Sequence, residues 1–119
     1  MPMSLVINHY EFGKVIVNDK IYTKDIKIFK DKIISPWWRK EGHLLCLDDI
    51  KDILSKDLKV LIVGCGANSI MEVSEEVKDY CLKNNIELHI LNSYDAVKKF
   101  NSLNEKIKSS TALCLHLTC

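Results

Sequence analysis

Short apolar, β-branched runs alternate with polar turns through the first third of the chain. The apolar residues fall into five runs, at 5–7, 15–17, 21–22, 26–29 and 33–34. Loosely alternating runs of this length are typical of half-buried antiparallel strands. Pro36 ends the series, because proline has no N–H to donate to a strand ladder. The pattern therefore predicts antiparallel strands over residues 1–46.

The spacing of the apolar residues changes after residue 48. Ile50, Ile53 and Leu54 share one face of a short helix. Asp48 or Asp49 can cap this helix, because a carboxylate accepts from the free amides of a first turn. The change of period marks the start of a second half with a different organisation.

Strands and helices alternate from there to the end of the sequence. The unbroken apolar run 60–63 is typical of a strand covered on both faces, and it predicts a central, parallel strand. Apolar residues at helical spacing predict a helix from Met71 to Cys81, which Asn84 and Asn85 end. We expect the remaining elements to be a strand at 86–91, a helix capped by Ser93 and reaching Leu103, and a strand at 112–118.

This order of elements predicts one α/β domain over residues 1–119. Strands that alternate with helices in the second half imply right-handed crossovers between parallel strands. The first half adds a smaller antiparallel part. We therefore expect a mixed central sheet, with antiparallel strands from the N-terminal half and βαβ crossovers in the C-terminal half.

Composition narrows the classes of protein that fit. Apolar residues make up 47% and charged residues 28% of the 119 positions, which is enough for a folded core. Seventeen lysines and arginines against sixteen acidic residues give a net charge of +1, which argues against nucleic-acid binding through bulk charge. No apolar run approaches the roughly 20 residues that span a bilayer, so we expect no membrane insertion.

The first residues and the cysteines bear on the cellular compartment. Residues 1–4 lead into no basic segment followed by an apolar one, and so predict no secretion signal. The odd set of five cysteines, without a Cys-x-x-Cys pair, comprises Cys46, Cys65, Cys81, Cys114 and Cys119. Secreted disulfide scaffolds have a different pattern. We expect reduced thiols in a cytoplasmic protein.

A glycine turn follows the predicted central strand. Its candidate ligand-binding residues are Gly64, Cys65, Gly66, Ala67 and Asn68. Open α/β sheets place ligands at the carboxyl ends of strands, and the free amides of a helix start attract anions. Ser69 stands where the dinucleotide fingerprint needs its third glycine, which argues against a nucleotide. The turn is then either a site for a small anion or carboxylate, or a tight turn with no ligand.

Cys65 admits two interpretations. A helix N-terminus lowers the pKa of a nearby thiol, so Cys65 would act as a nucleophile if His43 or His116 approached it. Cysteines beside glycine turns are more often small packing residues, and this second interpretation favours an inert thiol.

Trp37, Trp38, Arg39 and His43 form a second candidate site. Adjacent side chains of an extended segment point to opposite sides, so one indole can be buried and the other exposed. Arg39 is the only arginine in the sequence, and arginine offers a planar fork for bidentate oxyanion recognition. In one interpretation Arg39 and His43 flank a hollow that binds a carboxylate or a partner. In the other, Trp37 fills the core while Arg39 pairs with a surface acid.

The C-terminal cysteines and histidine do not form a metal-ligand set. Cys114 and His116 share one face of the last predicted strand, whereas Cys119 falls on the other. Structural zinc takes four ligands, and the sequence has no second close pair of Cys or His. We therefore expect no metal and no other cofactor, and we expect His9 and His89 to be ordinary strand residues.

Several motifs occur in one order along nearly all of the chain. They are Ile7-x-x-Tyr10-x-Phe12-Gly13, Tyr22-x-x-Asp25-Ile26, Trp38-Arg39-x-x-Gly42-His43, Gly64-Cys65-Gly66, Ala96-Val97-x-x-Phe100-Asn101 and Leu115-His116-Leu117-Thr118-Cys119. Together they resemble the Mth938-type domain family, a domain of unknown function whose relatives include an adipogenesis-associated protein and a mitochondrial assembly factor of respiratory complex I. The resemblance implies a three-layer α/β fold and no established reaction. The family turn is usually Gly-Thr-Gly, so Cys65 departs from it.

The expected function follows from these candidates. We expect a non-enzymatic binding or assembly protein that docks an unidentified protein partner through Trp37, Trp38 and Arg39, since the sequence shows no acid–base–nucleophile set. The alternative is a small-anion or metabolite binder, with or without enzymatic activity. It would use the glycine turn, with Arg39 and His43 as partners of a carboxylate or phosphate.

Overall fold

Five strands form a mixed sheet through the middle of the molecule in the computed structural model, which describes residues 5–119. Their order across the sheet is β5 (Lys32–Ile34), β4 (Ile26–Phe29), β10 (Thr111–Leu115), β7 (Val60–Gly64) and β9 (Glu87–Leu91). β4 is antiparallel to β5 and β10, whereas β10 and β9 are both parallel to β7. The predicted mixed sheet is confirmed. The expectation for residues 1–4 lies outside the described residues.

Burial on both faces explains why β7 lies inside this sheet. All of its residues are buried, and its side chains alternate between two cores. Leu61 and Val63 pack into one apolar cluster, whereas Val60 and Ile62 pack into the other. An unbroken apolar run is what a strand between two cores requires, so the prediction from residues 60–63 is confirmed.

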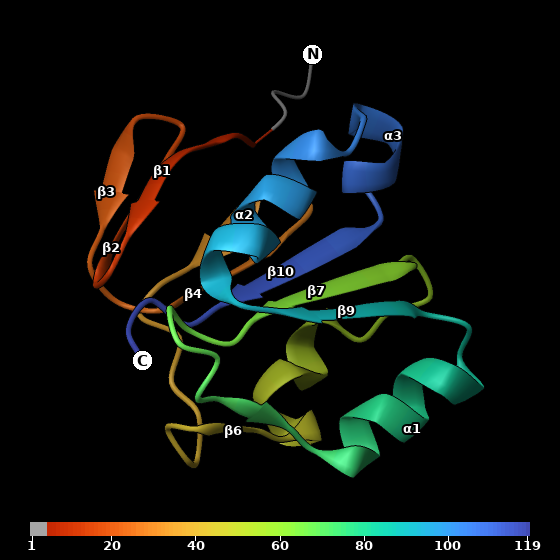
Figure 1. Cartoon of the computed structure of the whole chain (residues 1–119). Coiled ribbons are helices and arrows are strands. Elements are labelled where there is room, and N and C mark those ends of the chain that lie inside the picture. The colour runs from red at the N-terminus through yellow and green to blue at the C-terminus, as the bar shows by residue number, and fades with distance from the viewer. Residues whose placement is uncertain (1–4) are drawn as a thin grey trace.

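Helices cover both faces of the sheet and give the molecule three layers (Figure 1). The 3-10 helix η1 (Leu47–Ile53) and α1 (Glu75–Lys83) lie on one face, and α2 (Ser93–Ser102) and α3 (Glu105–Lys108) lie on the other. α1 buries Val77 and Cys81, and α2 buries Ala96 and Phe100 toward the sheet. The spacing of these residues is that of one helical face.

A separate antiparallel sheet precedes the central one in the chain. It consists of β1 (Ile7–Glu11), β2 (Lys14–Val17) and β3 (Lys20–Tyr22). Asn18 and Asp19 between β2 and β3 have φ values of 45° and 68°, as a two-residue hairpin turn of type I′ requires. Ile7, Tyr10 and Val15 of this sheet pack into the same cluster as α2.

The prediction that a helix begins at Met71 is wrong. A short strand, β8 (Glu72–Val73), pairs in parallel with β6 (Leu44–Leu45), and α1 begins only at Glu75. Met71 and Val73 are buried although they lie in an extended segment. Their spacing in the sequence therefore resembled that of the buried face of a helix. The glycine turn is therefore not followed directly by a helix.

Other boundaries differ by a few residues. The cap of α2 is Asn92, whose side chain accepts from the Asp95 amide, so Ser93 is the first helical residue and not the cap. The last strand ends at Leu115 and not at residue 118. All five cysteines are free thiols. Among the described residues, no helix is long and apolar enough to cross a bilayer.

Candidate functional site

The pairing of β4 with β10 makes Asp25 and His116 neighbours. Ile26 at the start of β4 lies opposite Leu115 at the end of β10. Asp25 precedes β4 and His116 follows β10, so this register brings the two side chains together at one end of the sheet. The His116 Nδ1 and Asp25 Oδ2 atoms are 2.8 Å apart, although the residues are 91 positions apart in the chain.

The Asp25 carboxylate accepts hydrogen bonds from three groups. His116 Nδ1 and Arg39 Nη2 both donate to Oδ2, at 2.8 and 2.9 Å, and the Leu117 amide donates to Oδ1 at 2.8 Å. Burial opposes the ionisation of Asp25, but these hydrogen bonds outweigh it and hold the pKa of Asp25 below its ordinary value. Asp25 is therefore an anion at neutral pH.

The Arg39 side chain is buried against Trp37. Only 4% of the side chain is exposed, and the guanidinium lies 4.8 Å from the centre of the Trp37 ring. Nε and Nη2 both donate to the Gly42 carbonyl, at 3.3 and 2.8 Å. Trp37 Nε1 donates to the Asp49 carbonyl at 3.0 Å. The guanidinium is thus held on one side by an indole and on another by the backbone.

Two buried polar atoms of this cluster have no hydrogen-bond partner within residues 5–119. They are Arg39 Nη1 and His116 Nε2. Because Asp25 is ionised, His116 Nδ1 carries the proton that it donates to Asp25, and Nδ1 does not accept from Arg39 Nη2, which lies 3.2 Å away. Nε2 of a neutral His116 is then a free acceptor. An unsatisfied buried polar group costs about 1–3 kcal/mol, so both atoms favour a bound group.

Asp25, Arg39 and His116 line a pocket of about 270 Å³, which we call the arginine pocket. Trp38 also lines it and is 74% exposed, whereas Trp37 is 4% exposed. The predicted division of the two indoles between core and surface is confirmed. His43 is exposed, and the centre of its ring lies 5.8 Å from that of His116.

The amides of the glycine turn are already used within the chain. Gly66 N donates to Ser93 Oγ at 2.9 Å, Ala67 N to the Thr118 carbonyl at 2.9 Å, and Asn68 N to the Cys119 carbonyl at 3.0 Å. Gly66 has a φ of 102°, and a Cβ there would collide with the backbone of residues 118 and 119. The turn therefore holds the C-terminal segment, and its amides are not free to bind an anion.

No hydrogen bond joins the Cys65 thiol to His43 or His116 among the described residues, although the His116 amide donates to the neighbouring Gly64 carbonyl at 2.9 Å. Cys65 is 1% exposed and packs in the apolar cluster with α1. Burial raises the pKa of the Cys65 thiol to about 11, and α1 begins ten positions later, at Glu75. Thr118 is the link between this turn and the arginine pocket, because it accepts from Ala67 and also lines the pocket.

Asp25 is the site residue that the sequence analysis did not select. An isolated acid before an apolar run carries no spacing signal, and Asp25 entered only as part of the motif Tyr22-x-x-Asp25-Ile26. Arg39 was selected because it is the only arginine, and it does pair with an acid. That acid is 17% exposed and so is not a surface residue.

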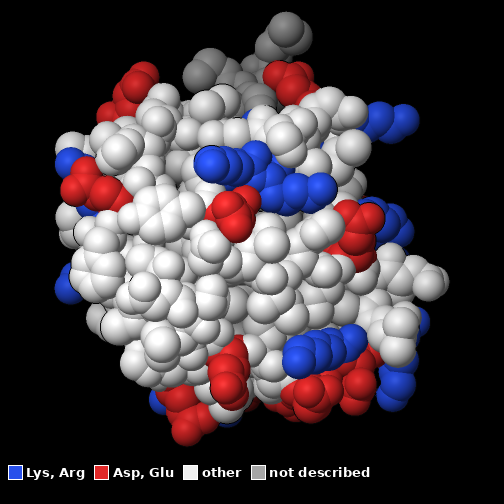
Figure 2. All heavy atoms as spheres, viewed as in Figure 1, with Lys and Arg blue, Asp and Glu red and all other residues white. Residues whose placement is uncertain are grey.

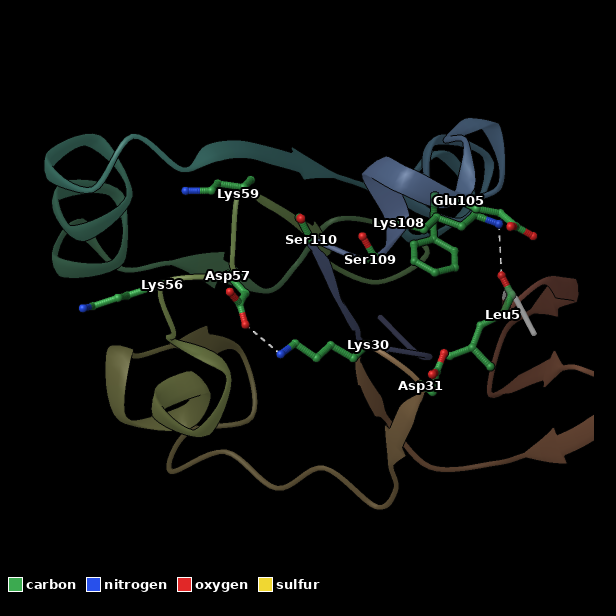
Figure 3. Close-up of a pocket in the computed structure, with 11 residues that line it drawn as sticks. Leu5, Lys30, Asp31, Lys56, Asp57, Lys59, Glu105, Lys108, Ser109 and Ser110 are labelled. Carbon is green, nitrogen blue, oxygen red and sulfur yellow. Dashed lines mark hydrogen bonds and ion pairs between the residues drawn. The ribbon is translucent and has the colours of Figure 1, made fainter. Parts of the chain in front are cut away.

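A larger hollow lies at the opposite end of β7, and we call it the lysine cleft (Figure 3). Its volume is about 670 Å³, and its lining includes Lys30, Lys56, Lys59 and Lys108. Lys30 Nζ bonds Asp57 Oδ2 at 2.8 Å, and Lys108 Nζ donates to the Leu5 carbonyl at 3.0 Å. Lys30, Lys56 and Lys59 are exposed side chains whose charges water can solvate.

The protein is a three-layer α/β domain with a mixed central sheet and an Asp25–Arg39–His116 cluster at one end of that sheet. A family model described as "Protein of unknown function (DUF498/DUF598)" matches residues 7–116. The chain belongs to this DUF498/DUF598 family. The expected resemblance to the Mth938-type domain is confirmed.

Solved structures share the fold over almost the whole chain. An outer membrane protein from Bartonella henselae has a TM-score of 0.80 at 21% identity, covering 99% of this chain and 98% of its own. The hypothetical protein PH1505 from Pyrococcus horikoshii OT3 has a TM-score of 0.78 at 24% identity, covering 98% and 100%. A Mth938-like domain from Bordetella pertussis has a TM-score of 0.73 at 14% identity, covering 95% and 85%. At these identities the likeness is one of fold alone.

Proposed function

We propose that this protein is a non-enzymatic binding or assembly protein that docks a protein partner at the arginine pocket. The observation that carries the proposal is the buried Arg39 guanidinium, whose Nη1 has no partner among the described residues, in a pocket that the exposed Trp38 also lines. Tryptophan and arginine dominate the binding energy of protein interfaces when they lie in a pocket that a partner can fill.

The surface charges also favour docking by shape and local polar contacts. On the face drawn in Figure 2, basic and acidic side chains are interspersed, and much of the area between them carries no charge. The net charge of +1 agrees with this mixture. A partner of this face would be recognised through apolar and specific polar contacts more than through a long-range field.

The cluster offers little for nucleophilic catalysis. His116 Nε2 would be the base of an Asp–His pair, yet no hydroxyl or thiol of the described residues is hydrogen-bonded to it. Cys65 is buried, and its raised pKa leaves little thiolate at neutral pH. Both observations support binding over covalent chemistry.

The test is affinity purification from the native cell with three forms of the full chain. Trp38→Ala removes the exposed indole and leaves the Asp25–Arg39–His116 contacts in place. Phe12→Ala is the matched control, because Phe12 is 58% exposed and does not line the pocket. We expect a partner that wild type and Phe12→Ala retain and that Trp38→Ala loses by about tenfold or more. If Trp38→Ala keeps every partner, the arginine pocket is not the docking site.

A small-anion or metabolite binder is the second candidate function. The two unpartnered atoms at Arg39 and His116 favour it, and the pocket then replaces the glycine turn as its site. A thermal-shift panel of carboxylates, phosphates and nucleotides tests it. A ligand at 100 times its Kd adds about 2.7 kcal/mol to the free energy of unfolding, so silence at millimolar concentrations would reject this candidate.

A further inference from the structure

We infer that the arginine pocket binds a carboxylate group, and that this carboxylate is an acidic side chain of the protein partner, held by Arg39 Nη1 and His116 Nε2. The inference rests on the proposed docking function and names the group that is recognised. It starts from the two buried atoms that lack partners within the described part of the chain.

The hydrogen-bonding capacity of Arg39 is only partly used. A guanidinium has five N–H donors, and Asp25 and the Gly42 carbonyl take those of Nε and Nη2. The two N–H groups of Nη1 remain, on a side chain that is 4% exposed. Nη1 can therefore donate single hydrogen bonds, and a negatively charged carboxylate oxygen is a stronger acceptor for them than a neutral oxygen.

The charges of the cluster favour a ligand that carries a single negative charge. Asp25 and Arg39 cancel each other, so a bound carboxylate leaves one net negative charge unless His116 takes up a proton. A protonated His116 donates from Nδ1 to Asp25 and from Nε2 to the carboxylate, which restores neutrality. A phosphate dianion would still leave a charge uncompensated in a buried site, at a high desolvation cost.

The size of the pocket favours a side chain over a cofactor. Its volume of about 270 Å³ is close to the lower limit of the range of about 300–1,000 Å³ that is typical of small-molecule sites. Nη1 and Nε2 are themselves buried, so we expect a side chain that lines the pocket, such as the exposed Trp38, to move when the carboxylate enters. Trp38 would then cover the aliphatic part of the acidic side chain.

Nuclear magnetic resonance of the full chain tests this directly, because Arg39 is the only arginine and gives a single set of guanidinium signals. The probe is N-acetyl-glutamate N-methylamide. Its neutral isostere, N-acetyl-glutamine N-methylamide, and inorganic phosphate are the matched ligands. We expect saturable shifts of the Arg39 signals with the glutamate derivative and at least about tenfold weaker binding of the other two.

Two variants separate recognition from general charge. Arg39→Lys keeps the positive charge but loses Nη1, so its Leu117 and Thr118 amides are expected to show no saturable shift. Lys98→Ala removes an exposed charge outside the pocket, and it is expected to bind within about twofold of wild type. A backbone amide spectrum like that of the wild type shows that each variant is folded.

The outcomes distinguish this inference from the function on which it rests. Absence of any saturable shift, equal binding of phosphate, or full binding by Arg39→Lys would each overturn the carboxylate site. If any of these results were found together with a partner that depends on Trp38, the docking function would be retained and the carboxylate site would be rejected. Specific binding of the glutamate derivative without a Trp38-dependent partner would overturn the partner as the source of the carboxylate.

Discussion

The arginine pocket and the lysine cleft hold their charges in opposite ways. In the pocket, Asp25 and Arg39 are 17% and 4% exposed, and each hydrogen bond is made inside the protein. In the cleft, Lys30 and Asp57 are 53% and 64% exposed, so water solvates both groups. The smaller cavity therefore holds a buried ion pair, Asp25–Arg39, whereas the larger one is lined by an exposed pair, Lys30–Asp57. Cavity volume alone would select the lysine cleft.

The buried ion pair of the arginine pocket is not explained by stability alone. Replacing buried charges by apolar residues is often neutral or stabilising, so packing alone does not account for a charged cluster at this end of the sheet. The unpartnered atoms Arg39 Nη1 and His116 Nε2 add to that cost. Lys30, Lys56 and Lys59 of the cleft carry no such cost, because their side chains are exposed.

Removing the Asp25 charge is expected to have the largest effect. Asp25→Asn keeps the shape of the side chain but leaves the Arg39 guanidinium buried beside a neutral group. Breaking a buried pair in this way costs about 3 kcal/mol of the free energy of unfolding, measured by urea unfolding. Asp57→Asn in the lysine cleft is the control and is expected to unfold like wild type. Equal losses in the two variants would remove the distinction between the two regions.

The sequence predicted the central elements because their signal is local. The apolar run 60–63 predicted a strand between two cores, and β7 lies there. The segment after it was predicted as a helix from Met71, because the spacing of Met71 and Val73 does not distinguish a short buried strand from a helical turn. The pairing of β6 with β8 depends on a contact between distant residues, and two-residue strands carry no periodicity.

The candidate site was predicted only in part for the same reason. Arg39 and Trp38 were selected from their residue types and their neighbourhood in sequence. Asp25 was not, because its partners Arg39 and His116 lie 14 and 91 positions away. Only the register of β4 with β10 brings His116 to it. The glycine turn was selected from a motif, and its amides turned out to be occupied by the C-terminal segment.

Unfolding at low pH provides a second test of the buried pair, because the pKa of Asp25 is lowered in the folded state. The hydrogen bonds that outweigh the effect of burial stabilise the charged form only when the chain is folded. That contribution is complete above the ordinary pKa of 3.8 and is lost as the pH falls toward the folded value. The difference in unfolding free energy between wild type and Asp25→Asn is therefore expected to narrow below about pH 4. A constant difference down to about pH 2 would show that Asp25 is not stabilised as an anion.

The lysine cleft provides a smaller effect, and a double-mutant cycle measures it. Lys30 and Asp57 form an exposed pair in which each partner is more than half exposed. We expect no measurable coupling between Lys30→Ala and Asp57→Asn in urea unfolding, and no change when salt is added, because solvent already screens both charges. A strong, salt-sensitive coupling would mean that the cleft constrains charge as the arginine pocket does.

Cys65 is expected to give the smallest effect, and it tests whether burial alone makes a reactive group. The pKa of its thiol is raised from 9.0 to about 11 by burial, which makes the thiolate about 100-fold scarcer at neutral pH than in a free cysteine. We therefore expect Cys65 to react with a thiol reagent at least about tenfold more slowly than free cysteine, as measured by mass spectrometry of peptides from briefly labelled, folded protein. Cys119, which is half-buried, serves as the internal control for labelling.

Cys65→Ser is expected to retain the partner that depends on Trp38, because Cys65 does not line the arginine pocket. A rate tenfold above that of free cysteine, lost in Cys65→Ser, would show thiol chemistry at the glycine turn and contradict the non-enzymatic function.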